Sequence, residues 1–337
     1  MKRLVLFFFF CIAVLNSAKS IQKFGNIGNL ALESGDTLFD CKVGYVEFGI
    51  INKDSSNIII FPSWYGGTAE QIKGTLGKER LIDTTKYFVI ALDALSNGIS
   101  TSPSNSEKQP HSKFPQITMR DMVNSQYLLL TKILKIKKVF AVVGGSMGSM
   151  QTFEWIVAYP DFMQKAIPYV CTPRVSSSDL LTWNLRKEII ESYTRLNADE
   201  KQIQKVTSMM MSLLARTFEH INENVKADEF DKYMTKFDSE PNQIFTSENS
   251  LYQLNAMIKH NIFRNDDNSM EKTAKKIKAK VMMIVSEKDM LVNPKPSLEF
   301  APFINAKVLT LTNNCGHLAP GCEWEKCSVE IQKFFNQ

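Results

Sequence analysis

A serine lies at the centre of the most informative motif in the sequence. Residues 144–148 (GGSMG) satisfy the pattern G-x-S-x-G, directly after the apolar run 138–143 and before a helix that we expect over 149–159. At a sharp strand-to-helix turn a serine hydroxyl is exposed, and the first N–H groups of the helix can stabilise an oxyanion. The pattern predicts that Ser146 is a nucleophile and that the Met147 N–H is an oxyanion-hole donor. A glycine-rich turn that binds phosphate is the alternative interpretation.

A serine nucleophile needs a base, and the sequence offers four histidines. We expect His317 to be the base, because it stands in a Gly-His pair just after the apolar run 306–311. Asp289 follows the run 281–285 and would hold one tautomer of His317 and stabilise the imidazolium, with Glu287 as the alternative acid. The order serine, acid, histidine is the one used when the serine stands on a strand-to-helix turn. The sequence therefore predicts a Ser-His-Asp triad.

A second oxyanion-hole donor is expected from the loop after an earlier apolar run, residues 57–61. That loop reads PSWYGG over residues 62–67, and its two glycines let the backbone approach Ser146 closely. We expect the Trp64 N–H to be the donor, with the Tyr65 N–H as the alternative. The rings of Trp64 and Tyr65 would line a small acyl pocket or else pack in the core.

These side chains need a scaffold, and short apolar runs indicate what it is. The runs are mostly continuous rather than alternating, which is typical of strands covered on both faces of a parallel sheet. Helices expected over 119–134 and 149–159 alternate with them, as in a series of βαβ units. The six runs are residues 57–61, 87–92, 138–143, 166–170, 281–285 and 306–311.

The alternation of strands and helices breaks between about residues 175 and 280. Helices are expected there over 180–196, 199–222, 228–236 and 250–262. A helical insertion at the carboxyl edge of a parallel sheet is predicted to form a lid over the site, the alternative being a plain packing layer. The methionines 209–211 at its centre would form a homodimer face or pack the lid onto the sheet.

The first twenty residues have the pattern of a secretory signal. Lys2 and Arg3 precede an apolar run over 4–15, and Ala18 and Ser20 supply the small residues of a cleavage site. Twelve residues rise only about 18 Å as a helix, too short to span a bilayer comfortably. We expect a mature protein that is secreted or periplasmic, without stable membrane insertion; an uncleaved N-terminal anchor is the alternative. The domains are then 1–20 signal peptide, 21–174 core, 175–279 lid and 280–337 core.

Composition and charge limit the remaining possibilities. The 337 residues are 44% hydrophobic and 22% charged, enough for a large core, and the formal charge is only +5. This balance argues against nucleic acid as the main partner. No G-x-G-x-x-G follows a strand and no H-E-x-x-H occurs, so no metal or other cofactor is expected.

The cysteines leave their pairing undecided. If Cys11 leaves with the signal, an odd number of cysteines remains, so at least one is unpaired. The remaining cysteines could include a disulfide or be buried free thiols; they are Cys41, Cys171, Cys315, Cys322 and Cys327.

Over about residues 28–335 the chain resembles the α/β-hydrolase superfamily, and within it the homoserine O-acetyltransferase-like branch of acetyltransferases and small-ester esterases. The resemblance implies a mostly parallel central sheet with helices on both faces and an inserted helical lid, and it assigns nucleophile, acid and base to Ser146, Asp289 and His317. It is carried by residues 87–93 (YFVIALD), 97–105 (NGISTSPSN), 114–121 (FPQITMRD), 145–161 (GSMGSMQTFEWIVAYPD), 251–257 (LYQLNAM) and 316–317 (GH).

The sequence also departs from that branch. The acetyltransferases usually have His-Ala-Leu-Thr-Gly where residues 62–66 read PSWYG, and Ser149 replaces the second glycine of their nucleophile turn. Arg186 is the nearest candidate for the arginine that holds their substrate carboxylate. We therefore expect an exported serine hydrolase that cleaves a small carboxylic ester or thioester through an acyl-serine. The alternatives are an O-acyltransferase of the homoserine type and a catalytically inactive binding module.

Overall fold

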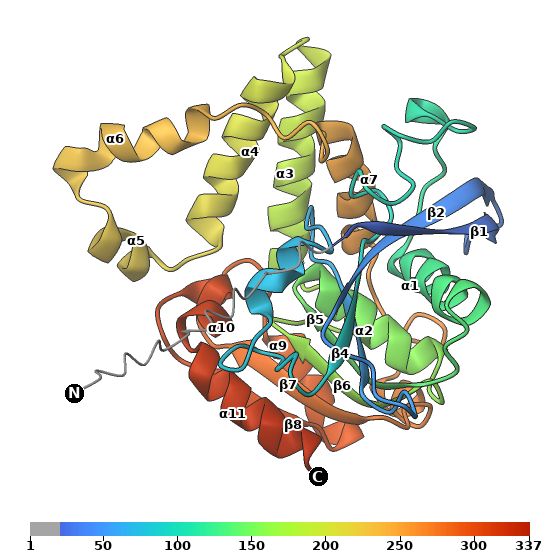
Figure 1. The fold of residues 1–337 in the computed structure, drawn as a ribbon. Coiled ribbons are helices and arrows are strands. Elements are labelled where there is room, and N and C mark those ends of the chain that lie inside the picture. Colours follow the sequence, from blue (N-terminus) through green and yellow to red (C-terminus); the bar gives the residue numbers. More distant parts are fainter. Residues whose placement is uncertain (1–20) are drawn as a thin grey trace, which may run out of the picture.

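A computed structural model describes residues 21–337, so the expected signal peptide lies outside the described residues. Strands and helices alternate through most of this range (Figure 1). The strands are β1 (Lys23–Ala31), β2 (Thr37–Phe48), β3 (Ile58–Pro62), β4 (Phe88–Leu92), β5 (Val139–Gly145), β6 (Met163–Tyr169), β7 (Lys280–Ser286) and β8 (Lys307–Leu311). The helices are α1 (Met119–Leu128), α2 (Met147–Ala158), α3 (Ser177–Arg195), α4 (Glu200–Leu214), α5 (Phe218–Asn224), α6 (Phe230–Met234), α7 (Ser247–Ile258), α8 (Met270–Ala274), α9 (Lys295–Phe300), α10 (Ala319–Cys322) and α11 (Trp324–Phe335).

The strands form one sheet in the order β1-β2-β4-β3-β5-β6-β7-β8. From β4 to β8 all neighbours are parallel, whereas β1 and β2 form an antiparallel hairpin that adds to β4. The six apolar runs of the sequence correspond to β3 through β8, so the mostly parallel sheet is confirmed. The β1–β2 hairpin was not predicted, because polar residues interrupt its apolar ones.

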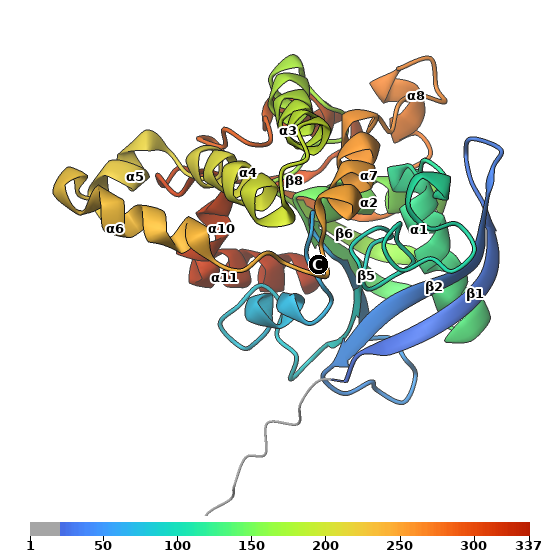
Figure 2. The same cartoon turned by 90° about the horizontal axis from the view of Figure 1, so that it is seen from above.

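Helices cover both faces of the sheet, and alternate residues of β3 illustrate why. Ile58 and Ile60 belong to a core cluster with Phe153 of α2, whereas Ile59 and Phe61 belong to the opposite cluster with Ile331 of α11. Side chains alternate across a strand, so a continuous apolar run serves two cores at once. Figure 2 shows α1 and α2 on one side of the sheet and α11 on the other. Both layers keep the strand ends in fixed positions.

The segment between β6 and β7 carries helices α3 to α8, and Figure 1 shows α3, α4 and α7 standing together beyond the sheet while α5 and α6 extend to one side. The single helix expected over 199–222 is wrong. Helix α4 ends at Leu214 and α5 begins at Phe218, because the Thr217 side chain accepts a hydrogen bond from the His220 N–H and caps a new helix. The helix expected over 119–134 also ends early, at Leu128, and a short π-helical turn follows.

A buried carboxylate joins helices α1 and α2 to the segment after α7. The Glu154 side chain is 1% exposed and accepts hydrogen bonds from Arg120 Nε (2.7 Å) and Arg264 Nη1 (2.5 Å). His260 packs beside it, with its buried Nδ1 3.9 Å from Glu154 Oε1 and without a hydrogen-bond partner within residues 21–337. Burial alone would raise the pKa of Glu154, but the two guanidinium groups outweigh burial and lower it.

Among the described residues, no helix combines the length and the apolar character needed to cross a bilayer.

Candidate active site

Ser146 lies at the turn between β5 and α2 in a strained backbone conformation, with φ 55° and ψ −125°. A side chain at the flanking glycines would not fit. A Cβ on Gly144 would lie 2.3 Å from the Gly148 carbonyl oxygen, and a Cβ on Gly148 would lie 2.5 Å from the Pro62 carbonyl oxygen. The two glycines therefore let three backbone segments converge tightly enough to present Ser146 at the end of the sheet.

His317 and Asp289 meet Ser146 at this turn. His317 Nε2 lies 2.9 Å from Ser146 Oγ, and His317 Nδ1 lies 2.7 Å from Asp289 Oδ2. An ionised carboxylate only accepts hydrogen bonds, so Nδ1 carries the proton and Nε2 is free to accept the Ser146 hydroxyl proton. The three side chains form a continuous hydrogen-bonded chain from carboxylate to hydroxyl.

The alternative acid, Glu287, does not belong to this chain. It is exposed, and its backbone N–H donates to the Leu311 carbonyl at the β7–β8 edge. Asp289 has a side chain only 1% exposed, and it comes two residues later, where the chain has turned inward. The structure thus brings together the three residues that the sequence selected.

Of the two expected oxyanion-hole donors, Met147 directly follows Ser146 in the chain, and Trp64 lines the same cavity as Ser146. Met147 is the first residue of α2, where a backbone N–H has no partner within the helix. Trp64 begins a turn closed by the Gly67 N–H donating to the Trp64 carbonyl (2.9 Å), and its own N–H has no acceptor within residues 21–337. Gln151 of α2 donates to the Ser63 carbonyl at 3.0 Å and so fixes this loop against the nucleophile turn.

A cavity of about 530 Å³ opens above Ser146 and His317. Its wall is mostly apolar and mixes residues of the sheet edge, the inserted helices and the C-terminal segment. Arg216, between α4 and α5, is the charged side chain of this wall, and no ion pair or hydrogen bond to its guanidinium occurs among the described residues. The lining residues are Trp64, Tyr65, Thr75, Gly145, Ser146, Tyr169, Val170, Met211, Ala215, Arg216, Leu291, His317, Leu318, Pro320, Gly321, Cys322 and Trp324.

The cavity wall contains Arg216 and not Arg186, the arginine expected from the sequence. Arg186 of α3 lies behind the wall rather than in it, with its guanidinium 4.9 Å from the centre of the Tyr65 ring. Its Nε and Nη1 atoms are buried without a hydrogen-bond partner among the described residues. Arg216 was missed, because no motif marks a single arginine between two helices. Met211 also lines the cavity, which favours packing over a dimer face for at least this methionine.

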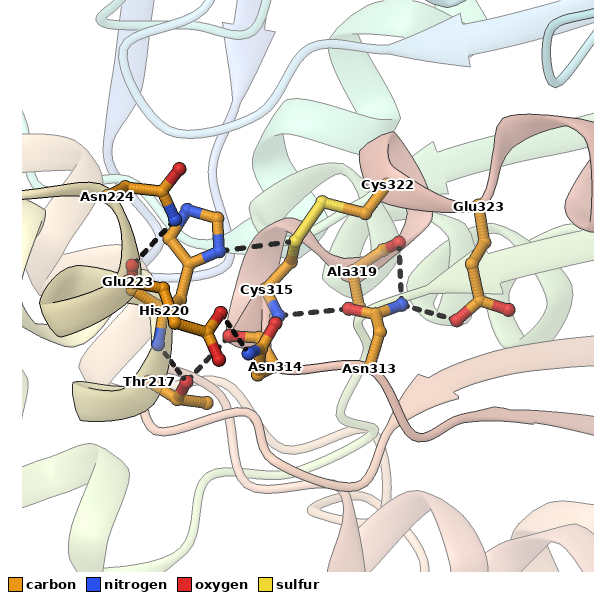
Figure 3. Close-up of a disulfide and its surroundings, with 10 residues drawn as sticks. All are labelled: Thr217, His220, Glu223, Asn224, Asn313, Asn314, Cys315, Ala319, Cys322 and Glu323. Carbon is orange, nitrogen blue, oxygen red and sulfur yellow. Dashed lines mark hydrogen bonds between the residues drawn. A yellow bond between two sulfur atoms is a disulfide. The ribbon is translucent and has the colours of Figure 1, made fainter.

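One disulfide forms among the cysteines of residues 21–337. Cys315 and Cys322 form a disulfide (Figure 3). Within the described chain Cys41, Cys171 and Cys327 are free and buried. Sequence reasoning had left this pairing open. Burial raises the pKa of the Cys171 and Cys327 thiols to about 12, so both stay protonated at neutral pH.

A comparison with protein families identifies the family to which the chain belongs. Residues 57–320 match the family described as the alpha/beta hydrolase fold, which is more than half of the chain. The chain belongs to the α/β-hydrolase family. Both the superfamily and the fold expected from the sequence are thereby confirmed.

Curated relatives of this α/β hydrolase include esterases and acetyltransferases. A probable esterase of Corynebacterium glutamicum is 38% identical over 178 residues, covering 52% of this chain and 51% of the relative. The ethyl acetate hydrolase of Pseudomonas veronii is 35% identical over 193 residues, covering 57% and 54%. A homoserine O-acetyltransferase of Pelobacter propionicus is 34% identical over 179 residues, covering 46% and 48%. The matches thus span about half of each relative's length, and they confirm the homoserine O-acetyltransferase-like branch.

The likeness to a solved structure extends over more of the chain than the likeness to the curated relatives does. An acetylester hydrolase from Corynebacterium glutamicum superposes with a TM-score of 0.84 at 24% identity, covering 94% of this chain and 96% of that one. At this identity the likeness bears on the fold alone.

Proposed function

We propose that this protein is an exported serine esterase that cleaves a small carboxylic ester through an acyl-serine intermediate. The observation that carries the proposal is the hydrogen-bonded chain Asp289–His317–Ser146 at the base of a mostly apolar cavity. Such an arrangement activates a hydroxyl that is otherwise a poor nucleophile. It also makes a catalytically inactive binding module the weaker alternative, because a binding module has no need for all three groups.

The reaction follows from the positions of these groups. As Ser146 Oγ attacks the ester carbonyl carbon, His317 Nε2 takes the hydroxyl proton, and the carbonyl oxygen becomes an oxyanion. The N–H groups of Met147 and Trp64 donate to that oxyanion, and their preorganisation lowers the barrier. His317 then gives its proton to the leaving alcohol, and the acyl group remains on Ser146.

Water completes the turnover in the same site. His317 takes a proton from a water molecule, the resulting hydroxide attacks the acyl carbon, and the second tetrahedral intermediate collapses when Ser146 Oγ recovers the proton. Asp289 stays ionised throughout and stabilises the imidazolium in both halves. The products are a carboxylic acid and an alcohol, so no cofactor is consumed.

Two observations support the preference for a small ester and for export. Relatives at 35–38% identity are named as a probable esterase and as an ethyl acetate hydrolase. Residues 1–20 have the composition of a secretory signal, and the Cys315–Cys322 disulfide fits an oxidising compartment. An exported enzyme meets water everywhere but little acetyl-CoA, which favours hydrolysis over transfer.

Arg216 favours a second candidate function, O-acyl transfer to an acceptor that carries a carboxylate. A guanidinium that has no ion-pair partner among residues 21–337 and lies in an apolar wall would bind such a group strongly, and Arg186 lies close behind Tyr65. A homoserine O-acetyltransferase is among the relatives. Which function applies depends on whether an alcohol outcompetes water at the acyl-serine.

Labelling with a fluorophosphonate tests the proposed function directly. We expect one phosphonyl group per chain in the wild type and none in the Ser146→Ala variant. Equal labelling of both proteins would contradict the nucleophile. Product analysis with acetyl-CoA plus homoserine then separates the two functions, because acetylated homoserine would indicate transfer and acetate alone would indicate hydrolysis.

A further inference from the structure

The Cys315–Cys322 disulfide encloses the proposed base in a small covalent ring. The two cysteines are seven residues apart, and His317 lies between them. Cys322 also lines the cavity that contains Ser146 and His317. Within the ring the backbone forms a 3₁₀ turn over Gly316–Leu318 and then α10. The bond therefore limits how far the His317 backbone can move away from Ser146.

The same loop is held from outside by the start of α5, as Figure 3 shows. Thr217 Oγ1 donates to the Asn314 carbonyl at 2.6 Å, and Asn314 Nδ2 donates to Glu223 Oε2 at 2.7 Å. Gly316 adopts φ +63°, and a Cβ there would lie 3.0 Å from the Arg216 Cα. One side of the loop is thus fixed by α5 and the other by the disulfide, with His317 between the two.

The two sulfur atoms have different surroundings. Cys315 is 6% exposed, and its Sγ lies 3.6 Å from His220 Nδ1, whereas Cys322 is exposed. In thiol–disulfide exchange the more accessible sulfur is attacked, and a leaving thiolate that is stabilised departs faster. An imidazole next to a thiolate provides such stabilisation. The geometry therefore favours attack at Cys322 with Cys315 leaving beside His220.

We propose that this disulfide is a positioning element for His317 and that its reduction lowers the esterase activity reversibly; the inference rests on the proposed function. A dithiol thiolate attacks Cys322 Sγ, and the Cys315 thiolate leaves. The second thiol of the reductant then displaces Cys322, so the dithiol is oxidised to its cyclic disulfide. Cys315 and Cys322 together gain two electrons and two protons. Released from the ring, the His317 loop samples positions in which Nε2 no longer faces Ser146 Oγ.

The test measures turnover of p-nitrophenyl acetate and the rate of fluorophosphonate labelling before and after treatment with dithiothreitol. Alkylation followed by mass spectrometry verifies that Cys315 and Cys322 have been reduced. We expect kcat and the labelling rate to fall about tenfold or more, since small misplacements of a catalytic group are costly. KM should change less than kcat, because most of the lining residues lie outside the disulfide ring. Oxidised glutathione should restore kcat.

Variants separate positioning from general destabilisation. Cys315→Ser/Cys322→Ser should reproduce the loss of kcat and no longer respond to dithiothreitol. Cys327→Ala is the matched control, because it removes a buried thiol of the same segment and leaves the disulfide intact; its kcat should respond to reduction as the wild type does. His220→Asn should keep the initial activity and slow reduction severalfold. An unchanged reduction rate in this variant would overturn the assignment of Cys315 as the leaving sulfur.

The outcomes of the two proposals are distinguishable. If the oxidised wild type is neither labelled nor active, both proposals are overturned. If it is labelled and active but reduction changes neither kcat nor the labelling rate, the positioning proposal alone is overturned. The same holds if activity falls only in proportion to unfolding, as followed by circular dichroism in the same samples.

Discussion

Asp289 divides its two carboxylate oxygens between His317 and the backbone. Oδ2 accepts from His317 Nδ1 at 2.7 Å, and Oδ1 accepts from the N–H groups of Leu291 and Val292, each at 2.9 Å. The backbone contacts fix the rotation of the carboxylate, so Oδ2 cannot turn away from the imidazole. The loop after β7 thereby determines which nitrogen of His317 faces Ser146.

The Asp289→Asn variant should lose most of its activity while keeping its fold. The amide oxygen can keep the backbone hydrogen bonds, but the amide nitrogen would then donate toward His317 and favour the tautomer that cannot accept the serine proton. We expect kcat to fall by about three to four orders of magnitude, measured with p-nitrophenyl acetate. Glu287→Gln is the control and should stay within about twofold; an equal loss in both variants would contradict the assignment of the acid.

Gly148→Ala should reduce activity through the oxyanion loop. Alanine favours helix formation by about 1 kcal/mol over glycine, but its Cβ would approach the Pro62 carbonyl oxygen to 2.5 Å and displace the loop that carries Trp64. We expect kcat to fall about tenfold or more, with a small change in KM. Gly74→Ala is the matched control, because a Cβ there meets nothing within 4 Å. Full activity of the Gly148 variant would argue against the close approach of this loop.

Arg216→Met should discriminate between neutral and anionic substrates. Methionine keeps an unbranched, flexible stem and removes the charge, so a neutral ester should be cleaved with nearly unchanged kcat/KM. A substrate or acceptor that carries a carboxylate should show a KM raised about tenfold or more, as is typical for the loss of a charge-assisted hydrogen bond. The measurement is a pair of steady-state assays with a neutral ester and its carboxylate analogue. Equal effects on both would exclude Arg216 as an anion-binding residue.

Acid should destabilise the fold through His260. Burial lowers the pKa of His260 from 6.5 to about 4, with the Arg264 and Arg120 charges acting in the same direction against the opposing attraction of Glu154. Between these two pH values the unfolded chain binds more protons than the folded one, so the free energy of unfolding falls as the pH drops through that window. The full effect is about 3 kcal/mol at most. Glu154, whose pKa is lowered, adds a further loss below pH 4.5.

Urea unfolding at pH 7 and pH 4.5 measures this effect. His260→Gln keeps a donor toward the Thr172 carbonyl but cannot titrate, so its stability should change less between the two pH values than that of the wild type. His111→Gln is the control, since the His111 side chain is 70% exposed. A wild type and a His260 variant with the same pH dependence would disprove the role of this histidine.

Much of the scaffold could be predicted because it depends on local patterns. Continuous apolar runs identified β3 through β8, since strands buried on both faces have no polar side to interrupt them. The edge hairpin of β1 and β2 escaped because it is partly exposed, with charged residues such as Asp40 and Lys42 within β2. The helix break at Thr217 also escaped, because a threonine is common inside helices as well as at their caps, and the contact of Thr217 with the Asn314 carbonyl depends on the fold.

The site itself was predictable where its residues follow strand ends. Ser146, Asp289 and His317 each come shortly after a strand, and parallel strands present such positions at one edge of the sheet. The place of Arg216 in the cavity wall and the pairing of Cys315 with Cys322 could not be predicted in the same way. Their places depend on how α4, α5 and α10 pack around the cavity, which no local pattern in the sequence encodes.

The contact between Ser146 and His317 joins positions 171 residues apart in the chain. A ribosome working from one end to the other completes the nucleophile turn long before it adds the imidazole. In the proposed mechanism, a nascent chain that ends before His317 would react slowly with esters, because its exposed hydroxyl has no proton acceptor. Loss of the segment after β8 would remove His317 and, with α11, the helix that covers one face of the sheet.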